Sequence, residues 1–440
     1  MTQSNICLIG DVVVDVTLKD ANSETKLRMG GIVHAARCLW ALNIPFSVGY
    51  FAPSYLDAQI HDYLNSLGCT DIIKIGNVVG SPYVFLIEEA KEIGDQGYEL
   101  LLRDEIQIEY NESNCESLFQ KVHNDYLLIS GNYDLVKLAN QLSGKIHIDV
   151  ANNIKDIASL CDLKSKLETI FISTSSDIFK ASYDDSFLGF TGQFENKTKR
   201  IILKENRGGS RGYDFLEKAV TVSNAQTQPI IHSVGVGDVY CAAFVSQYHE
   251  KSLKDAMVLS SWIATEYAIT TYPDDFKKGV ARVIQSKVTD LVNIEGVSLP
   301  WEKRNNINIY IAAPDFDFVD TKPINILVDS LRYHNFKPRR PIEENGQMAF
   351  DATKARKQEI FSADMKMFDE CSILIAVLLY DDPGTLIEIG LAAAKGLPTI
   401  VYDPYNRATN CMLTELPRLV TSNLDEVIAE VFIAASKLNL

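Results

Sequence analysis

The chain has 440 residues, of which 46% are hydrophobic and 23% are charged, and its net charge is −16. This length exceeds one ordinary hydrophobic core and predicts two or three domains. The acidic balance argues against nucleic acid or an anionic membrane as the main partner, since both favour a basic protein surface.

Cysteine usage and the start of the chain indicate a cytoplasmic protein. The eight cysteines form no C-x-x-C pair and no group with histidines, which is typical of reduced thiols and predicts neither disulfides nor a metal site. Asp11 and Asp15 interrupt the first apolar segment, and no apolar run approaches the length of a membrane span. We therefore expect neither a signal peptide nor a transmembrane helix.

Strand and helix patterns alternate over residues 1–292 and predict a doubly wound α/β domain. Apolar strand patterns lie at 6–11, 47–51, 126–129, 146–149, 169–172 and 200–203. Helical patterns lie at 33–42, 55–67, 239–248, 253–270 and 275–291. The alternation of strand and helix is interrupted at residues 76–110, where strand patterns at 83–87 and 98–102 flank a polar turn. We predict that this region forms an antiparallel lid.

Two glycine-rich segments of this first domain are candidates for binding a phosphate. The loop KENRGGSRG contains Lys204 and Gly208, and the turn SVGVGD contains Gly235, Val236 and Gly237 directly before a helix. Glycines let backbone amides converge on one point, and a helix N-terminus adds partial positive charge. The alternative at the second segment is a tight turn with Asp238 as the helix cap.

The layout of residues 4–290 resembles the ribokinase-like (PfkB) carbohydrate kinase family, and GVGDVYCAAF resembles its second signature. The resemblance implies that Asp238 is the base that takes a proton from the acceptor hydroxyl, with Gly235 to Gly237 as its anion hole. It also implies ATP and Mg²⁺ as co-substrates. The implied sugar-binding residues are Asp15, Gly30, Gly31 and His34.

The first domain departs from the family pattern at three places. His232 stands where an aspartate usually opens the signature, and His34 stands where an asparagine is expected. The nearest match to the magnesium motif Asn-x-x-Glu is Thr174 to Asp177. Phosphoryl transfer and ligand binding without turnover therefore both remain open for this domain.

Residues 293–306 form a polar connector, and a second α/β domain is expected at 307–440. A strand is predicted at 307–312 and helices at 322–334 and 352–370, with Ser422 and Asp425 capping a last helix. The basic segment KPRRP at 337–341 is interpreted as a solvated loop, with a nucleotide phosphate site as the alternative.

The stretch ILIAVLLYDDPGTLIEIG at 373–390 carries the strongest chemical signal. A buried strand at 373–379, a helix from Thr385 and a strand at 399–402 form a βαβ unit. Ligands bind outside the carboxyl ends of such strands, so Asp381, Asp382 and Glu388 are expected in a site. Crowded carboxylates suit paired acid and nucleophile roles. The alternative is a capping box in which Glu388 folds back on Thr385.

DPGTLIEIGLAAAKGLPTIVY, with IYIAAP at 309–314 and NCML at 410–413, resembles the nucleoside 2-deoxyribosyltransferase family over residues 305–440. The resemblance implies a flavodoxin-like or Rossmann-like fold that needs no cofactor. Glu388 would attack the anomeric carbon, Tyr310 would hold its carboxylate, and Asp382 would orient or protonate the leaving base. Asn410, in the element that also contains Met412, would complete a neighbouring subunit's site, so a homo-oligomer is expected.

Together these patterns predict a two-domain enzyme of nucleoside metabolism acting on small-molecule nucleosides, nucleotides and sugars. An alternative is a nucleotide or dinucleotide N-glycosidase regulated by a first domain that binds a ligand without turnover. A paired sensor without catalysis is the third hypothesis.

Overall fold

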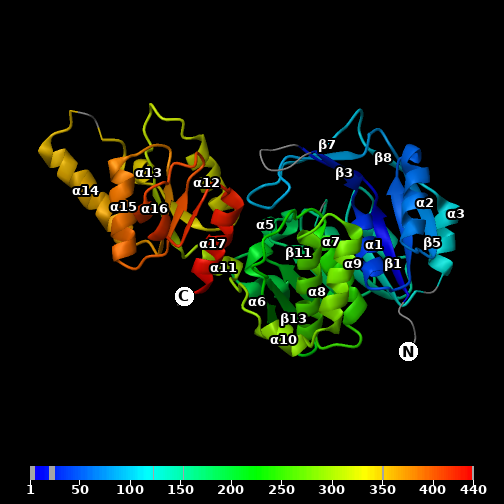
Figure 1. Ribbon diagram of the computed structural model, residues 1–440. Helices are drawn as coiled ribbons and strands as arrows, with labels where there is room; N and C mark the ends of the chain where they lie inside the picture. Colours follow the sequence, from blue (N-terminus) through cyan, green and yellow to red (C-terminus); the bar gives the residue numbers. More distant parts are fainter. Residues whose placement is uncertain (1–4, 19–24, 122, 152, 349–350, 439–440) are drawn as a thin grey trace. The chain divides into compact units, whose positions relative to one another are not determined.

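A computed structural model of the chain describes residues 5–18, 25–121, 123–151, 153–348 and 351–438. These form two compact units, whose elements are labelled in Figure 1. Unit 1 consists of Met1–Lys91 and Gln96–Ser298, and unit 2 of Glu92–Asp95 and Leu299–Leu440. Among the described residues, no helix has the length and apolar character needed to cross a membrane.

The main sheet of unit 1 has ten strands and confirms the predicted doubly wound α/β fold. In sheet order the strands are β14 (Ala219–Ser223), β13 (Ser210–Asp214), β12 (Thr198–Lys204), β11 (Leu167–Ser173), β10 (Lys145–Asp149), β9 (Asp125–Ile129), β1 (Ile6–Asp11), β4 (Phe46–Ala52), β5 (Asp71–Val79) and β8 (Gln107–Tyr110). β1 pairs in parallel with β4 on one side and β9 on the other. The strand order therefore reverses at β1, and ligands of such sheets bind beside the carboxyl end of this switch point.

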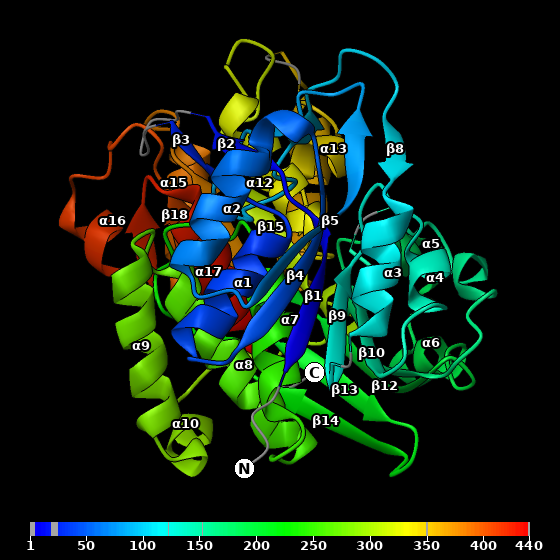
Figure 2. The same ribbon diagram turned by 90° about the vertical axis from the view of Figure 1, so that its right-hand side faces the viewer.

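Helices cover both faces of this sheet, and Figure 2 shows α1, α8 and α9 on one side with α3, α4 and α6 on the other. They are α1 (Ile32–Ala41), α2 (Asp57–Ser66), α3 (Glu112–Gln120), α4 (Leu135–Ala139), α5 (Asp177–Ser182), α6 (Phe187–Gly192), α7 (Val236–Gln247), α8 (Leu253–Ala268), α9 (Pro273–Gln285) and α10 (Val288–Asn293). Apolar residues of β1, β4, α1, α7 and α8 share one buried core. This core fixes the start of α1 and of α7 beside the carboxyl ends of the strands.

The lid of unit 1 differs in composition from the one predicted at 76–110. It is a four-stranded sheet of β3 (Lys26–Met29), β2 (Val14–Thr17), β6 (Val84–Ile87) and β7 (Tyr98–Leu100). β5 and β8, at the two ends of the predicted lid, belong to the main sheet instead. β2 and β3 were not predicted because they are short and half polar; β2 is held by pairing with β6, where Asp15 lies opposite Phe85.

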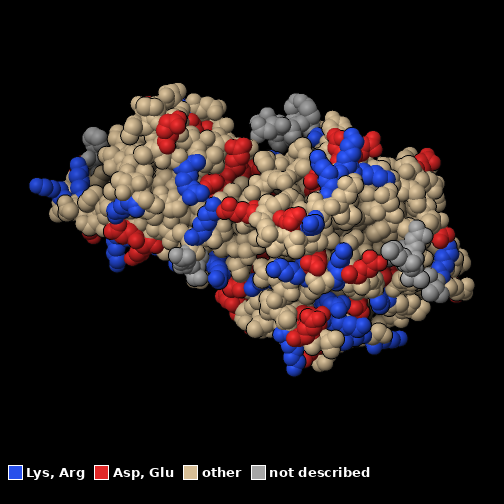
Figure 3. Space-filling view, turned by 60° about the horizontal axis from the view of Figure 1, so that its bottom comes forward, with Lys and Arg blue, Asp and Glu red and all other residues tan. Residues whose placement is uncertain are grey.

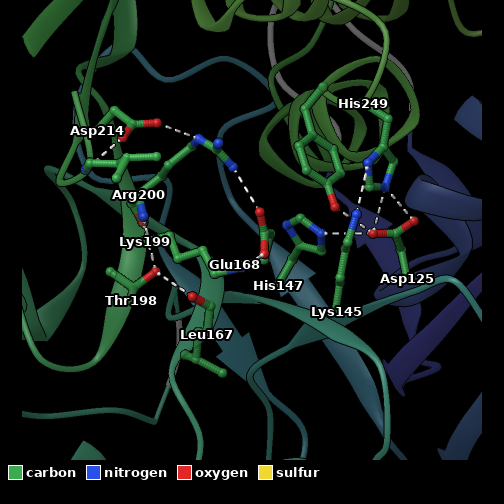
Figure 4. Close-up of polar contacts among 12 residues, drawn as sticks. Asp125, Lys145, His147, Leu167, Glu168, Thr198, Lys199, Arg200, Asp214 and His249 are labelled. Atoms are coloured by element: carbon green, nitrogen blue, oxygen red, sulfur yellow. Dashed lines mark hydrogen bonds and ion pairs between the residues drawn. The ribbon is translucent and has the colours of Figure 1, made fainter.

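A buried polar network joins the amino-terminal ends of β9 to β12 (Figure 4). The Asp125 carboxylate accepts a 2.7 Å hydrogen bond from Tyr248 and lies 2.8 Å from His249 Nε2 and 3.3 Å from His147 Nε2. Burial lowers the pKa of His147, so its ring is neutral at neutral pH. Because the network lies at the end of the sheet opposite to the ligand edge, we interpret it as structural.

Unit 2 is built on a parallel sheet in the order β16 (Lys337–Arg339), β15 (Asn308–Ala312), β17 (Ile373–Val377), β18 (Thr399–Tyr402) and β19 (Leu419–Thr421). This order, second strand first, is the flavodoxin-like order and confirms the fold predicted for this domain. The helices are α11 (Trp301–Arg304), α12 (Lys322–Tyr333), α13 (Pro341–Asn345), α14 (Lys354–Asp369), α15 (Pro383–Ala394), α16 (Cys411–Glu415) and α17 (Leu424–Ser436).

The division between the two units lies between Ser298 and Leu299, within the predicted connector at 293–306. This connector includes α11, in which Arg304 is fully buried and its guanidinium lies 4.9 Å from the Phe432 ring centre.

Two local predictions for unit 2 were wrong. The basic segment at 337–341 is not a solvated loop: Lys337–Arg339 form the edge strand β16, and Pro341 begins α13. Arg339 and Arg340 are paired with carboxylates of Glu344 and Asp315.

The second correction concerns the last helix. Asn423, rather than Ser422, caps α17 by accepting a 3.0 Å hydrogen bond from the Asp425 backbone amide. Asparagine and serine are about equally good caps, so the sequence pattern alone could not separate them.

Lysines and arginines are mixed with acidic residues on the face shown in Figure 3, and no continuous basic surface is visible on that face. This distribution fits a chain with 42 basic and 58 acidic residues.

Candidate functional site

In unit 2, the helix that carries Glu388 begins directly after the strand β17 and its turn. Asp382, rather than Thr385, is the N-cap of α15: its Oδ2 accepts hydrogen bonds from the Thr385 backbone amide at 2.7 Å and from the Thr385 hydroxyl at 2.9 Å. Pro383 then occupies the first helical position, where its missing N–H costs nothing. The capping box, which was the alternative role for Glu388, is therefore not formed, and the Glu388 carboxylate is available for another contact.

That contact is with Tyr310 on β15, the strand that neighbours β17. The Tyr310 hydroxyl donates a 2.7 Å hydrogen bond to Glu388 Oε1. Burial raises the pKa of Glu388 to about 7, the negative charges of Asp364 and Asp382 add to this, and the Tyr310 hydrogen bond opposes it. The Glu388 carboxyl group therefore changes its charge close to neutral pH.

Asp364 on α14 is a further acid at this site that the sequence analysis did not select. Its Oδ1 accepts a 2.7 Å hydrogen bond from Asn345 Nδ2, and burial raises its pKa. The predicted helix at 352–370 contained Asp364, but nothing in its spacing indicated that the side chain acts electrostatically on Glu388. The sequence predicted a crowded group of Asp381, Asp382 and Glu388. In the structure, the acids that act on Glu388 are Asp364 and Asp382, so Asp364 takes the place of Asp381.

Asn410 and Met412 are not joined to this group. Asn410 caps α16 by accepting a 2.9 Å hydrogen bond from the Met412 backbone amide, and the Met412 side chain is 64% exposed. Asp381 is also exposed. Among the described residues, no hydrogen bond links these three side chains to Glu388.

In unit 1, the second glycine turn opens α7. Gly235 is the N-cap, with φ of 75°, a left-handed conformation that favours glycine. Val236 and Gly237 follow in the first turn, and Asp238 lies within it. The alternative that Asp238 is the helix cap is therefore wrong. The first backbone amides of α7 have no partner within the helix, and such amides at a helix N-terminus favour the binding of an anion.

Asp238 belongs to a charged group at the carboxyl ends of β10 and β12. Lys204 Nζ donates a 2.6 Å hydrogen bond to Asp149 Oδ2, and a β-carbon on Gly237 would lie 3.2 Å from Lys204 Nζ. Burial and the charge of Asp149 raise the pKa of Asp238 to about 8, although Lys204 opposes them. The sequence did not single out Asp149 as a site residue. Its position as the last residue of a predicted strand nevertheless indicates the edge of the sheet where ligands bind.

The predicted sugar-binding residues Asp15, Gly30 and His34 are brought together. A β-carbon on Gly30 would lie 2.1 Å from Asp15 Oδ2, and one on Gly235 would lie 2.2 Å from the His34 ring. His34 Nε2 lies 2.9 Å from Asp15 Oδ2, and Nδ1 lies 2.7 Å from the Tyr267 hydroxyl. Burial lowers the pKa of His34 to about 4, so the ring is neutral at neutral pH.

The neighbouring glycine Gly31 is the N-cap of α1, with φ of 62°. It therefore shapes the start of the helix that carries His34. A β-carbon there would lie 2.1 Å from the Asp11 carbonyl oxygen, so no larger residue fits without a shift of the backbone.

The basic glycine loop is a β-hairpin turn whose charges are largely satisfied internally. Gly208 is buried in a short 3-10 turn, and Arg211 pairs with Glu205 at 2.7 Å. Lys204 is thus the cation of this loop that reaches the group at Asp238.

The region that most resembled a magnesium motif does not gather acidic ligands. Thr174 is buried, Ser176 precedes α5 as its N-cap residue, and Asp177 is exposed. Within the described parts of the chain there is no group of three or more His, Cys, Asp or Glu residues that could hold a metal ion. The start of α7 with Lys204 fits a phosphate group, whereas the described residues gather no set of acids that fits Mg²⁺.

Both units are thus α/β domains that gather chemically active side chains at the carboxyl ends of their strands. Residues 309–422 match the family model of Nucleoside 2-deoxyribosyltransferase, and this segment contains Tyr310, Asp364, Asp382 and Glu388. No curated protein matches the chain.

Several solved structures are similar to this chain over about its first two thirds. Ribokinase from Arabidopsis thaliana, complexed with ribose and ATP, has 13% identity and a TM-score of 0.48, covering 65% of this chain and 100% of that chain. A nucleoside kinase from Methanocaldococcus jannaschii has 12% identity and a TM-score of 0.46, covering 64% and 99%. A point mutant of phosphofructokinase-2 from Escherichia coli has 12% identity and a TM-score of 0.47, covering 65% and 100%. The α/β class of unit 1 rests on its own strand order.

Proposed function

We propose that the second domain cleaves or exchanges the N-glycosidic bond of a nucleoside or nucleotide, with Glu388 as the nucleophile. The observation that carries this proposal is the 2.7 Å hydrogen bond from Tyr310 to a partly buried Glu388 whose pKa is raised to about 7. The match of residues 309–422 to a family of glycosyl-transferring enzymes supports it.

The proposed reaction has two displacement steps. A Glu388 carboxylate oxygen bonds to the anomeric carbon, while the bond from that carbon to the base nitrogen breaks and its electron pair leaves with the base. A second base or water then attacks the same carbon and releases the carboxylate. Tyr310 holds the Glu388 carboxylate in position. Asp382 Oδ2 is occupied by the Thr385 hydrogen bonds, so Oδ1 is the atom that would orient or protonate the leaving base.

For the first domain, we propose binding of a nucleoside or sugar beside Asp15 and Gly30, with Asp238 as the base for phosphoryl transfer from ATP. The group around Asp238 supports this role, since Asp149 and burial raise the pKa of Asp238 while Lys204 supplies positive charge. ATP bound at the start of α7 would supply the phosphoryl group. Mg²⁺ would normally neutralise the phosphates, and the described residues of unit 1 gather no group of three or more acids that could hold it.

A second candidate function is a glycosidase regulated by a first domain without turnover. Two observations favour it: His34 is hydrogen-bonded to Asp15, and no set of acidic magnesium ligands is gathered in the described part of unit 1. In that case ligand binding at Asp15 would change the rate of base release at Glu388.

Product analysis separates these functions. The purified protein is incubated with a panel of nucleosides and nucleotides, with and without ATP and Mg²⁺, and free base, exchanged nucleoside and ADP are measured. Free or exchanged base supports the role of the second domain. ADP together with a phosphorylated sugar or nucleoside supports a bifunctional enzyme, and binding without ADP supports the regulated glycosidase. If no base is released or exchanged from any substrate, the proposal for the second domain is wrong.

A further inference from the structure

A cavity of about 640 Å³ lies in unit 1, apart from the predicted sugar-binding residues. Its walls come from β3, α1, α2 and the start of α9, which Figure 2 shows near one another. Asp15, Gly30, His34 and Asp238 are absent from its lining. The volume falls within the range of about 300 to 1,000 Å³ that is typical of small-molecule sites.

Arg37 contributes a buried guanidinium group to this cavity, with only 8% of the residue exposed. Its nitrogens donate to the hydroxyls of Tyr63 at 2.7 Å and Tyr267 at 3.1 Å and to the Met29 carbonyl at 3.0 Å. These partners are uncharged, and no carboxylate of the described residues lies within ion-pair distance of Arg37. A buried charge without a countercharge is costly, so a bound anion would stabilise this arrangement.

Arg28 on β3 places a second guanidinium group on the same cavity. Its Nη2 donates to the Val234 carbonyl at 3.2 Å and lies 3.4 Å from His232 Nδ1. Burial lowers the pKa of His232 to about 3, so this ring adds no charge at neutral pH. Within the described part of the chain, Nε and Nη1 of Arg28 have no hydrogen-bond partner. Two guanidinium forks at one cavity match the oxygens of a phosphate group.

The lining also includes the aromatic side chains of Tyr63, Tyr267, Tyr272 and Phe276. Tyr267 and Phe276 are buried with their rings in edge contact at 5.0 Å, while Tyr272 at the start of α9 is 71% exposed. Among the described residues of the lining, Asp62 is the one acid, and it is exposed. Aromatic walls favour a ligand with a planar ring, because stacked and edge-on ring contacts add to the stabilisation from buried area.

We propose that this cavity binds an aromatic phosphate ester of the size of a nucleoside monophosphate, with its phosphate at Arg28 and Arg37 and its ring against the tyrosines. The site is distinct from the sugar-binding residues but connected to them. Arg37 Nη1 lies 3.1 Å from His34 Nδ1, and the other nitrogen of that ring lies 2.9 Å from Asp15. A ligand that draws Arg37 toward its phosphate would therefore alter the contact that holds His34 on Asp15.

Equilibrium dialysis with AMP, GMP, CMP and UMP tests this proposal in the full-length protein. At least one of them should bind saturably to wild type and to Asp15→Asn. Arg28→Gln should weaken that binding about ten-fold or more, because a charge-assisted hydrogen bond is lost. Arg282→Gln is the matched control: this arginine lies on α9, outside the cavity, and is paired with Glu266, so its loss should leave binding unchanged.

The matching nucleoside and inorganic phosphate identify which part of the ligand is bound. Both should bind more weakly than the nucleoside monophosphate. The proposal is overturned if none of the four nucleotides binds, or if Arg28→Gln binds like wild type. It is also overturned if Asp15→Asn abolishes binding, since the nucleotide would then occupy the sugar site, or if inorganic phosphate binds as tightly as the nucleotide. Thermal unfolding of each variant verifies that a loss of binding is not a loss of folding.

Discussion

The Tyr310 hydroxyl donates a 2.7 Å hydrogen bond to Glu388 Oε1, joining the first strand of unit 2 to the helix that follows β17. Glu388 does not form the capping box that was the alternative role for it, because the Thr385 backbone amide donates to Asp382 instead. Burial and the neighbouring acids raise the pKa of Glu388 to about 7, while the hydrogen bond from Tyr310 lowers it. The effect of the Tyr310 hydrogen bond on the pKa of Glu388 can be measured separately from the effect of burial and of the neighbouring acids.

The rate of base release should rise as the pH increases through about 7. A nucleophile must be deprotonated, and a carboxyl group whose pKa is raised to about 7 is largely protonated at pH 6 and largely ionised at pH 8. Initial rates between pH 5 and 9 measure the midpoint. A rate that is highest at pH 5 and falls through pH 7 would instead assign Glu388 as a general acid.

Replacing Tyr310 by phenylalanine should move this midpoint to higher pH and lower the rate by about ten-fold at pH 7. The hydrogen bond favours the ionised form of Glu388, and a hydrogen bond to a charged group contributes about 1.5–3 kcal/mol. The ring remains to pack against Phe368, whose centre lies 5.2 Å away. An unchanged pH profile in Tyr310→Phe would show that the hydrogen bond does not tune Glu388 during turnover.

In the first domain, Asp238→Asn should lower phosphoryl transfer from ATP by about 10²- to 10⁴-fold, which is the usual contribution of a positioned general base. Ligand binding should be nearly unchanged. The wild-type rate should rise with pH through about 8, because burial and Asp149 raise the pKa of Asp238 to that value and a base must be ionised.

Asp290→Asn is the control for this variant, since Asp290 is exposed in the first turn of α10 and has no part in the group at Asp238. ADP formation is the measurement. Equal rates in Asp238→Asn and wild type would remove Asp238 from the reaction. If wild type itself forms no ADP, the first domain is a ligand-binding domain without turnover.

Oligomers are expected, with Asn410 acting at the site of a neighbouring subunit. Mixing Glu388→Gln with Asn410→Ala, each inactive alone, should restore activity up to about a quarter of the wild-type value, because random dimers pair one intact Glu388 with one intact Asn410 in that share of sites. Sedimentation velocity gives the oligomeric state. A fully active monomer, or a mixture without recovered activity, would contradict this arrangement.

The inner parallel strands could be predicted because they are mainly apolar runs that end in turn signals; these are β1, β4, β9 to β12, β15, β17 and β18. The strands β5, β8, β13, β14, β16 and β19 were not predicted. The apolar run from Ile373 became β17, which is buried along its whole length. The helix start near Thr385 was misplaced because Asp382 is an equally good cap, although Pro383 directly after it was an unused indication.

Residues whose roles depend on tertiary contacts were harder to predict. Asp364 acts on Glu388 from another helix, so no local spacing could have selected it. Arg28 and Arg37 share a cavity because β3 folds back beside α1 and α2, and β3 itself was not predicted. Asp149 could have been predicted as a site residue, since it is the last residue of a predicted strand, at the edge of the sheet where ligands bind.

The central claim is that Glu388 is the nucleophile for base release, and Glu388→Gln tests it most directly. Glutamine can still accept the Tyr310 hydrogen bond. It also removes an ionisation that opposes folding: because the pKa of Glu388 is raised, stability decreases as the pH rises from 4.5 to about 7, and the cost persists above it. The variant should therefore unfold at pH 8 at a temperature no lower than wild type.

The decisive measurement is the rate at which free base appears, by chromatography, from the best nucleoside or nucleotide substrate at pH 8. Wild type and folded Glu388→Gln are compared at the same protein concentration. The nucleophile assignment predicts a loss of about 10³-fold or more in the variant. A rate for Glu388→Gln within a few-fold of wild type would contradict it.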